Sequence, residues 1–343
     1  MLKWYEEQGN FSDIVISSRV RLARNLVKYP FSPRINEIEA KELVEEVESA
    51  LAPYKDEDGR YYSCNLSKIS DIEKFAMMER HILSPELAGK RQAAAIVMSE
   101  NESTSVMVNE EDHLRIQSLA GGMNIEKAYE KANAMDDYTE DIFGYAYDEK
   151  YGYLTTCPTN VGTGLRASYM VFLPALGGAG KINRLSDEVS KYGVCLRGIY
   201  GEGTNGLGYI YQLSNQKTLG SSEADIITNL NSIAMQVVKQ ERKRREYLLT
   251  NNYDEMEDQV YRSYGVLKYT TQINAKDAMT LLAQIKFGVD TKIIEFKESF
   301  NIYQMMMAIQ PYSIQCISGK SVGSKVRDKL RAQYLNANLP DLK

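Results

Sequence analysis

The spacing of apolar residues predicts helices on both sides of a strand-rich stretch. Between positions 36 and 52 apolar residues recur at helical intervals, at Ala40, Leu43, Val44, Val47 and Leu51. Asn36 precedes this run and Glu39 follows three residues later, which is the pattern of a capping box. Asn124 is likewise placed to cap a long helix that runs to about Phe143. We therefore expect an amphipathic helix over 36–52 and a second, longer one after Asn124.

Shorter apolar runs predict β-strands. Residues 93–98 and 105–108 favour two strands, and the polar turn between them contains Glu100, Asn101 and Glu102. These two strands are expected to form a hairpin. Further strands are expected over 151–156, 167–173 and 209–213.

Helical spacing returns at Ser222 and dominates the rest of the chain. One face of this helix carries Ile226, Leu230, Ile233, Val237 and Val238. We expect it to end in the basic run 239–245, a solvated helix end favoured by the helix dipole, with a partner contact as the alternative. Later helices are expected from Asn274, over 297–310 and over 322–336, without strand patterns. The sequence thus predicts a mixed α and β domain over 1–250 and a small helical domain over 255–343.

Composition limits the classes of function. The 343 residues are 43% hydrophobic and 25% charged, as in a folded protein with one large and one smaller domain. The net charge of −5 argues against a general nucleic-acid binder and weakly favours a basic macromolecular partner. No apolar run approaches the ~20 residues of a membrane span, and the first residues do not resemble a signal peptide. We expect a cytoplasmic protein without membrane or direct nucleic-acid contacts.

The cysteines and histidines exclude common metal centres. The four cysteines are scattered without a CxxC pair, which excludes a zinc ribbon and fits reduced thiols. With only His81 and His113 in the chain, a multi-histidine centre is excluded as well. No metal site built from protein ligands is therefore expected.

Five arginines lie in contexts that suit phosphate binding. Arg19 and Arg21 are two residues apart, so in an extended segment they project to the same side. Arg115, Arg166 and Arg197 each lie in a loop or at a strand end beside small residues. Guanidinium groups grip phosphate oxygens bidentately, and each charge-assisted hydrogen bond contributes about 1.5–3 kcal/mol. Such a set can bind a nucleotide without a Walker loop, which the sequence lacks; for any single arginine the alternative is a surface ion pair.

Four stretches together resemble a known family. The segments SSRVRLARNL, NEEDHLRI, CPTNVGTGLRAS and LRGIYGE are similar to motifs of the ATP:guanido phosphotransferases, which include arginine and creatine kinases. Within that family the chain resembles the bacterial protein-arginine kinases of the McsB type. The resemblance covers about residues 12–247. It implies an α+β fold, with an antiparallel β-sheet flanked by helices in a glutamine-synthetase-like catalytic domain, followed by a small all-α domain.

The resemblance also implies the site residues. The catalytic residues would be Glu111, Glu202 and Cys157. The residues that bind ATP and its phosphates would be Ser18, Arg19, Val20, Arg21, Leu22, His81, Arg115, Arg166, Ala167, Ser168, Tyr169, Met170, Arg197, Gly198, Ile199, Tyr200 and Gly201. ATP is the implied phosphoryl donor, and Mg²⁺ is expected to arrive with the nucleotide. Met170 is a departure, because arginine kinases usually carry a histidine there that packs on adenine.

The helical C-terminal part carries a second motif. Arg327, Asp328, Arg331 and Ala332 form RDxxRA, which is similar to a phosphoarginine-sensing motif of the McsB-type enzymes. The two arginines are four residues apart, so both are expected on one helix face, where they can pinch a phosphoryl group. The alternative is an ordinary exposed helix in which Asp328 pairs with a neighbouring lysine.

The metabolite kinases also carry an N-terminal helical domain of roughly a hundred residues, whereas this chain begins almost directly at the phosphate-binding segment.

The implied acceptor raises a problem of proton transfer. A guanidinium has a pKa above 12 and a glutamate one near 4.3, so prior deprotonation would cost roughly 12 kcal/mol. We therefore expect Glu111 and Glu202 to hold the planar cation while one of them, by resemblance Glu111, accepts the proton as the N–P bond forms. Cys157 is assigned a positioning and electrostatic role. The alternative for Cys157 is an inert buried thiol.

Three functions remain open from the sequence. The first is an ATP-dependent kinase of arginine side chains in proteins, for which the resemblance implies four kinds of partner besides substrates with exposed arginines. These are an activator of the McsA type, a Clp-type ATPase or protease that degrades marked proteins in a stress response, a heat-shock repressor, and a second copy of the chain. The second is a kinase of free arginine. The third is a non-catalytic phosphoarginine-binding adaptor, disfavoured because the acidic and basic residues of the site are present.

Overall fold

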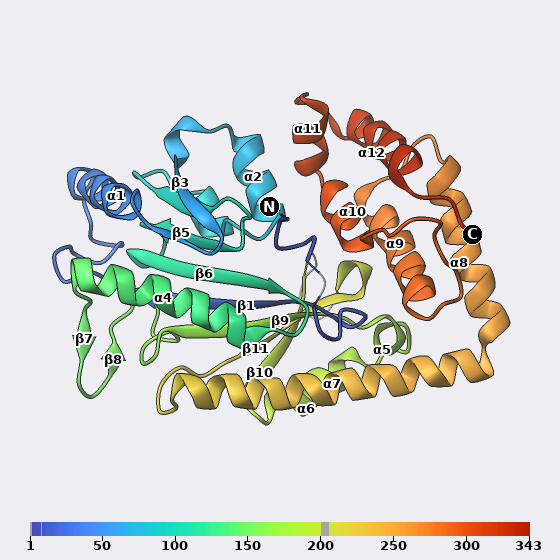
Figure 1. Ribbon diagram of the computed structural model, residues 1–343, viewed down its shortest axis with the longest axis horizontal. Helices are drawn as coiled ribbons and strands as arrows, with labels where there is room; N and C mark the ends of the chain where they lie inside the picture. The colour runs from blue at the N-terminus through green and yellow to red at the C-terminus, as the bar shows by residue number, and fades with distance from the viewer. Residues whose placement is uncertain (1, 8, 200–205) are drawn as a thin grey trace. The chain divides into compact units, whose positions relative to one another are not determined.

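The computed structural model describes residues 2–7, 9–199 and 206–343. Its main feature is a nine-stranded sheet in the order β10-β11-β9-β1-β6-β5-β4-β3-β2, flanked by helices (Figure 1). The strands are β1 (Val15–Arg24), β2 (Lys55–Asp56), β3 (Gly59–Asn65), β4 (Ala95–Ser99), β5 (Thr104–Val108), β6 (Leu114–Gly121), β9 (Leu165–Phe172), β10 (Val194–Gly198) and β11 (Ile210–Asn215). A separate two-stranded sheet pairs β7 (Tyr147–Asp148) with β8 (Gly152–Tyr153). The expected antiparallel sheet flanked by helices is confirmed.

Helices make up most of the remaining chain. They are α1 (Glu37–Leu51), α2 (Asp71–Glu79), α3 (Pro85–Ala88), α4 (Ile125–Phe143), α5 (Pro174–Gly178), α6 (Ile182–Ser190), α7 (Glu223–Asn251), α8 (Tyr253–Tyr269), α9 (Ala275–Asp290), α10 (Ile302–Ala308), α11 (Ser313–Ser318) and α12 (Ser324–Asn338), with short 3₁₀ turns η1 (Leu66–Lys68) and η2 (Leu207–Tyr209). Within the described residues, no helix combines the length and the apolar character that crossing a membrane requires.

The chain divides into two compact units. The first comprises residues 1–12, 17–169 and 214–232, and the second comprises 13–16, 170–213 and 233–343. These units are not divided at the boundary near 250–255 expected from the sequence, and that division into domains stays a prediction. Strand β10, helix α6 and most of β11 belong to the same compact unit as the C-terminal helices.

In the first unit β1 sets the direction of the arginines. It pairs antiparallel with β6, with Arg19 opposite Leu119 and Arg21 opposite Gln117. Side chains alternate across a strand, so Arg19 and Arg21 lie on one face while Val20 is fully buried on the other. The expected projection of both arginines to the same side is confirmed.

Two helices pack on this part of the sheet, α1 against β4 and β5, and α4 along β6 (Figure 1). The expected capping box of α1 is confirmed, because the Asn36 side chain accepts the backbone N–H of Glu39 and the Glu39 carboxylate accepts the backbone N–H of Asn36. The bounds of α4 match the expectation, but the capping role of Asn124 was wrong. Its side chain donates to the carbonyl of Gly121 at 2.6 Å, while the Ser18 hydroxyl accepts its backbone N–H at 2.8 Å.

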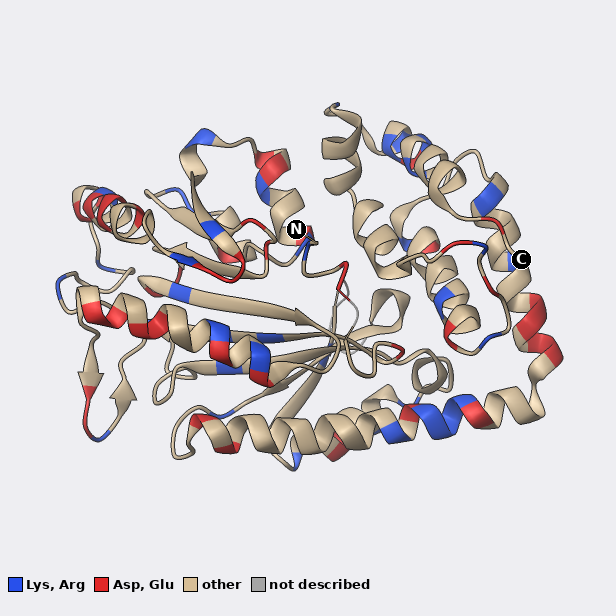
Figure 2. Cartoon of the chain, viewed as in Figure 1, with Lys and Arg blue, Asp and Glu red and all other residues tan. Residues whose placement is uncertain are grey.

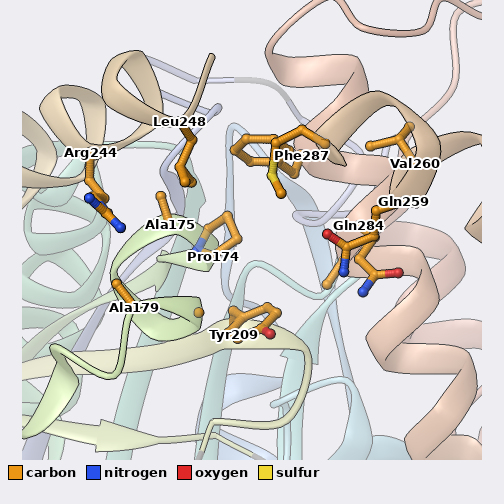
Figure 3. A pocket seen from close by; sticks show the side chains of 13 residues that line it. Pro174, Ala175, Ala179, Tyr209, Arg244, Leu248, Gln259, Val260, Gln284 and Phe287 are labelled. Carbon is orange, nitrogen blue, oxygen red and sulfur yellow. The ribbon is translucent and has the colours of Figure 1, made fainter. Parts of the chain in front are cut away.

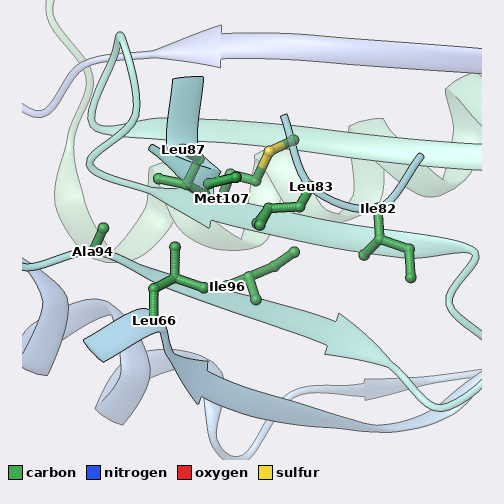
Figure 4. Packing of buried hydrophobic residues seen from close by; sticks show 8 residues of the cluster. Leu66, Ile82, Leu83, Leu87, Ala94, Ile96 and Met107 are labelled. Carbon is green, nitrogen blue, oxygen red and sulfur yellow. The ribbon is translucent and has the colours of Figure 1, made fainter. Parts of the chain in front are cut away.

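A small apolar cluster fixes the segment that follows α2. Ile82, Leu83 and Leu87 pack with Ile96 of β4 and Met107 of β5 (Figure 4). All five side chains are buried, so the chain directly after His81 is held against the sheet. The backbone of His81 has a φ of 61°, and its carbonyl accepts from Gln117 of β6 at 2.9 Å.

In the second unit the basic run 239–245 was placed wrongly at a helix end. Helix α7 continues to Asn251, so the run lies within the helix (Figure 2). Two of its residues are internal: Glu241 accepts the backbone N–H groups of Ala175 and Leu176, both at 3.0 Å, and pairs with Arg245 at 2.9 Å. The N-terminus of α5 therefore supplies hydrogen-bond donors for a buried acid, Glu241, within the run 239–245.

Other sequence expectations differ from the structure in length. The helix expected over 297–310 begins only at Ile302, after Asn301 caps it and after Phe296 forms a β-bridge with Leu342. The expected strand over 151–156 is limited to β8, because the residues after Tyr153 turn to bind another loop. The expected hairpin of β4 and β5 and the start of α9 at the cap Asn274 are confirmed.

Candidate active site

The acidic segment forms a tight loop between β5 and β6. Asn109 adopts a φ of 58°, its N–H donates to the carbonyl of His113 at 2.8 Å, and the N–H of Glu110 donates to the carbonyl of Asp112 at 3.1 Å. This turn separates three consecutive carboxylates. Glu110 and Asp112 are buried, whereas Glu111 at the tip is exposed. The loop therefore presents one acidic side chain and uses its two neighbours internally.

Asp112 joins this loop to the loop that carries Cys157. One of its carboxylate oxygens accepts the N–H of Thr156 at 2.6 Å and the amide of Asn25 at 2.6 Å. The Asn25 amide also donates to the carbonyl of Leu154 at 3.1 Å, and its oxygen accepts the N–H of His113 at 2.9 Å. Asn25 and Asp112 thus hold the two loops in a fixed relation.

The joined loops bring Glu111 and Cys157 together. The Cys157 thiol lies close enough to the Glu111 carboxylate to lower its pKa as a hydrogen-bonding group, and its sulfur lies 3.1 Å from the Thr159 hydroxyl. Partial burial raises the pKa of Glu111, and repulsion from Asp112 and Glu110 adds to the rise. The bond from Cys157 and the charge of Arg115 oppose it. A carboxylate whose pKa is raised holds a proton more readily than an ordinary one, as a general base requires.

Four of the five predicted arginines share one electrostatic environment. Burial lowers the pKa of Arg21 well below its usual value, and repulsion from Arg19, Arg115 and Arg166 lowers it further, while Glu110 opposes this. The Nε of Arg21 is buried and has no hydrogen-bond partner among the residues that the structure describes. Guanidinium groups gathered in this way, with an unpaired donor, fit a polyanion.

The arginines of this cluster differ in how the protein engages them. Arg115 forms an ion pair with the buried Glu110, and Arg19 donates to the Ser168 hydroxyl at 3.4 Å. Arg166 donates to the side chain of Asn160 at 3.2 Å and to the carbonyl of Asn215 at 2.8 Å, with longer bonds to the carbonyls of Thr159 and Gln216. Arg166 therefore holds the cysteine loop as well as contributing charge.

His81 lies in the same part of the first unit. Burial and the nearby charge of Arg19 lower the pKa of His81 to about 3, so its imidazole is neutral at physiological pH. Its ring lies 6.3 Å from that of Trp4. The structure thus places His81 beside one of the candidate phosphate-binding arginines, as an uncharged ring.

Several predicted nucleotide-binding side chains face protein partners. The Ser18 hydroxyl donates to the carbonyl of Gly122 at 2.7 Å, and Val20 and Leu22 are fully buried. Tyr169 donates to Asn231, and Met170 accepts from the Tyr303 hydroxyl at 3.0 Å. The N–H of Ala167 donates to the side chain of Asn215 at 2.9 Å, and Ser168 accepts from Arg19.

Arg197, Gly198 and Ile199 lie in β10 or directly after it. Arg197 is exposed in β10, and the N–H of Ile199 donates to the carbonyl of Ile210 at 3.1 Å. Gly198 ends β10 and is half-buried. The predicted residues Tyr200, Gly201 and Glu202 lie outside the described residues.

The RDxxRA motif lies on α12, but its two arginines are not equivalent. Arg331 is 1% exposed, and it donates to the carbonyls of Ile309 at 2.8 Å and Ile273 at 2.9 Å and to the carboxylate of Asp328 at 2.6 Å. Arg327 is half-buried and Ala332 is fully buried. Arg331 is thus held by two carbonyls and by Asp328, and recognition of a phosphoryl group by this motif stays a prediction.

Sequence reasoning missed the residues that support the site. Asn25, Glu110 and Asp112 position Glu111, Cys157 and Arg115, yet none of them was assigned a role. The signal was the run of three consecutive acids, of which only one can point outward at the tip of a tight turn. In the described part of the chain no group of three or more His, Cys, Asp or Glu side chains is arranged to hold a metal ion.

Comparison with known proteins places this geometry in a family. Residues 42–244 match the family described as ATP:guanido phosphotransferase, C-terminal catalytic domain. The chain belongs to the ATP:guanido phosphotransferase family. Residues 253–343 match the protein-arginine kinase McsB C-terminal domain. The resemblance seen in the four sequence motifs is thereby confirmed.

Curated relatives of this family match almost the whole chain. A protein named protein-arginine kinase from Clostridium kluyveri is 41% identical over 333 residues, which cover 97% of this chain and 96% of the relative. One of the same name from Bacillus mycoides is 42% identical over 341 residues, covering 98% and 95%.

Solved guanidino-kinase structures share the fold. A lombricine kinase matches with a TM-score of 0.60 at 24% identity, over 70% of this chain and 69% of that one. The duplicated taurocyamine kinase of Schistosoma mansoni with transition-state analogue components matches with a TM-score of 0.62 at 21% identity, over 91% and 48%.

Proposed function

We propose that the protein transfers the γ-phosphoryl group of ATP to the guanidinium of arginine side chains in proteins. The observation that carries this proposal is the position of Arg115. Its charge acts both on the Glu111 carboxylate and on the Arg21 guanidinium. The Glu111 carboxylate, which would hold the acceptor, and the arginines that would hold the phosphates are thus adjacent, as direct transfer requires.

The acceptor side of the reaction would use Glu111 and Cys157. The carboxylate of Glu111 binds the planar cation, and the Cys157 thiol that bonds it fixes its orientation. A new N–P bond forms while the bond between the γ-phosphorus and the bridging oxygen breaks. ADP leaves with that oxygen, and the guanidinium proton passes to Glu111. By family resemblance Glu202 would be the second carboxylate on the cation.

The donor side would use the arginine cluster. Arg21 offers an unpaired buried Nε, and Arg19 and Arg115 add charge beside it. Phosphoryl transfer leaves little covalent work for a protein, so alignment and charge stabilisation supply most of the rate enhancement. Mg²⁺ would be held by the nucleotide phosphates, neutralising part of their charge and leaving the arginines to orient the transferring group.

The substrate class follows from the relatives. They are named protein-arginine kinases and match the chain over nearly their full length, and residues 253–343 match the McsB C-terminal domain. We therefore favour arginine in proteins over free arginine as acceptor. The proposal has further parts. The protein senses phosphoarginine through Arg327, Asp328, Arg331 and Ala332, forms a homodimer and is located in the cytoplasm. It works with an activator of the McsA type, delivers substrates to a Clp-type protease and controls a heat-shock repressor.

One assay tests both the identity of the acceptor and the role of Glu111. The protein is incubated with MgATP and either an arginine-bearing unfolded protein or free arginine, and acid-labile phosphate is measured by mass spectrometry under conditions that preserve P–N bonds. We expect phosphorylation of the protein, its loss in Glu111→Gln with ATP binding retained, and no change in Glu149→Gln, which alters an exposed acid elsewhere. Phosphorylation of free arginine alone would establish a metabolite kinase, and full activity in Glu111→Gln would remove that residue from the mechanism.

A further inference from the structure

A cavity of about 290 Å³ lies within the second unit, and none of the described residues that line it is assigned to phosphoryl transfer. Helices α5, α7, α8 and α9 and the turn at Tyr209 enclose it (Figure 3). Much of its wall is apolar, formed by Leu248, Met256, Val260 and Phe287. Its size is at the lower end of the roughly 300–1,000 Å³ typical of small-molecule sites. The space therefore suits a compact ligand with an apolar body.

One wall of this cavity carries an uncompensated cation. Arg244 extends from α7 toward Ala175 and Ala179 (Figure 3), with its guanidinium 4.6 Å from the ring centre of Tyr247. Its Nε is buried without a hydrogen-bond partner, and no carboxylate forms an ion pair with it in the part of the chain that the structure describes. An arginine keeps its charge under all ordinary conditions, so a buried donor of this kind is satisfied best by an anion.

A buried acid on the same helix already has other partners. Glu241 lies one turn before Arg244 and is fully buried. Its two oxygens accept the N–H groups of Ala175 and Leu176, and one of them also pairs with Arg245. This carboxylate is thus bound to a residue of the cavity wall, Ala175, and forms no ion pair with Arg244.

Polar groups also line the side of the cavity opposite Arg244. Gln259 of α8 and Gln284 of α9 present their amides there (Figure 3). The Gln284 oxygen accepts from the Ser263 hydroxyl, which orients the amide so that its N–H groups remain as donors. Fixed polar groups within an apolar wall are what give small-molecule sites their specificity.

We propose that this cavity binds a small organic monocarboxylate with an apolar body. The carboxylate pairs with Arg244, the body packs on Leu248 and Phe287, and a polar group at the far end meets the two glutamine amides. A single guanidinium matches one negative charge, and among the residues that the structure describes Arg244 is the only cation that lines the cavity, which disfavours a phosphate dianion. The site is independent of the phosphoryl-transfer reaction and adds a metabolite-binding function to the helical part of the protein.

The test uses 4-phenylbutyrate and hexanoate as probes, with 4-phenylbutanamide as the uncharged analogue. Binding to the full-length protein is measured by isothermal titration calorimetry up to millimolar concentrations. We expect 4-phenylbutyrate to bind, and Arg244→Met to weaken it at least tenfold, which corresponds to about 1.4 kcal/mol. The amide should bind the wild-type protein at least tenfold more weakly than the acid, and Arg244→Met should leave the binding of the amide unchanged.

Lys243→Met is the matched control, because it removes the same charge from the adjacent, exposed position on α7. It should leave the affinity for the acid within about twofold of wild type, well below the effect of losing a charge-assisted hydrogen bond. Ala179→Leu fills part of the cavity and should weaken the acid and the amide alike, which tests the location even if Arg244→Met fails to fold. The proposal is overturned if neither acid binds, if Lys243→Met weakens binding as much as Arg244→Met, or if Ala179→Leu leaves the affinity unchanged.

Discussion

Asp112 accepts the backbone N–H of Thr156 at 2.6 Å, and this bond joins the two loops that carry Glu111 and Cys157. The same oxygen accepts the amide of Asn25, which comes from the end of the strand that carries Arg19 and Arg21. One buried carboxylate thus ties three segments that are distant in sequence. The candidate active site depends on this joint as much as on the residues that would touch a substrate.

Replacing Asp112 tests that joint. Asp112→Leu removes both hydrogen bonds, and we expect kcat/KM to fall by about 10²-fold, the order of loss caused by misplacing catalytic groups by ~1 Å. Asp112→Asn keeps one oxygen that can accept both bonds, so its activity should stay much closer to wild type. Because the charge of Asp112 raises the pKa of Glu111, this amide should also move the acidic limb of the pH profile to lower pH. Equal losses in the two variants would show that charge, not the joint, is what matters.

The pairing of Cys157 with Glu111 predicts a pH effect with a definite sign. The thiol's hydrogen bond lowers the pKa of Glu111, so Cys157→Ala should raise it. The carboxylate would then stay protonated, and unable to accept a proton, up to higher pH. The acidic limb of kcat/KM against pH should therefore move upward in Cys157→Ala and less in Cys157→Ser, which keeps a donor. An unmoved or lowered limb in Cys157→Ala would contradict the coupling.

Two arginines of the cluster should respond differently to the same substitution. In Arg21→Met we expect ATP to bind about 10- to 150-fold more weakly, the worth of a charge-assisted hydrogen bond of about 1.5–3 kcal/mol. Stability should be retained, because the lost Nε has no partner and repulsion within the cluster is relieved. Arg166→Met should weaken ATP binding and also lower the free energy of unfolding, because the carbonyls of Thr159 and Asn215 lose their donor. Calorimetric ATP titration and urea unfolding on both variants separate the two roles.

The two histidines, both with a lowered pKa, predict acid sensitivity of the fold. Burial lowers the pKa of His81, together with Arg19, and the pKa of His113 below the value of an unfolded chain. Their contribution to stability is present above the unfolded pKa of about 6.5 and is lost as pH falls toward the folded values. Each should contribute a slope of up to about 1.4 kcal/mol per pH unit.

The measurement is urea unfolding between about pH 7 and pH 5, where few other groups titrate. His81→Asn keeps a residue that tolerates the positive φ at this position and should flatten the slope by up to the share of one histidine. A slope identical to wild type would show that His81 is not held neutral in the folded protein.

Local signals in the sequence were sufficient where both partners are close along the chain. Asn36 and Glu39 satisfy each other across one helical turn, so the start of α1 followed from four residues. Asn124 shows the limit: its backbone is held by Ser18, 106 positions earlier, which left its side chain to bind Gly121 instead of capping α4. A partner at that separation leaves no trace in local spacing.

The candidate site shows the same division. The parallel projection of Arg19 and Arg21 followed from strand geometry alone. The acidic run 110–112 did not reveal which carboxylate points outward, because that depends on the positive φ of Asn109 and on the burial of its neighbours. In the same way, Glu241 and Arg245 belonged to a run that resembled a solvated helix end until α5 supplied partners for the buried charge.

The interior position of Arg331 bears on how recognition by α12 can be studied. Its guanidinium fastens the helix to the carbonyls of Ile309 and Ile273, so removing it will loosen this region whatever ligand the motif serves. In a protein altered at both Arg327 and Arg331, a loss of binding could come from a destabilised α12 or from lost recognition, and the two effects would not be separable. Arg327, half-buried one turn earlier, can be replaced without breaking the hydrogen bonds of Arg331 to Ile309 and Ile273. A single substitution there is the informative one.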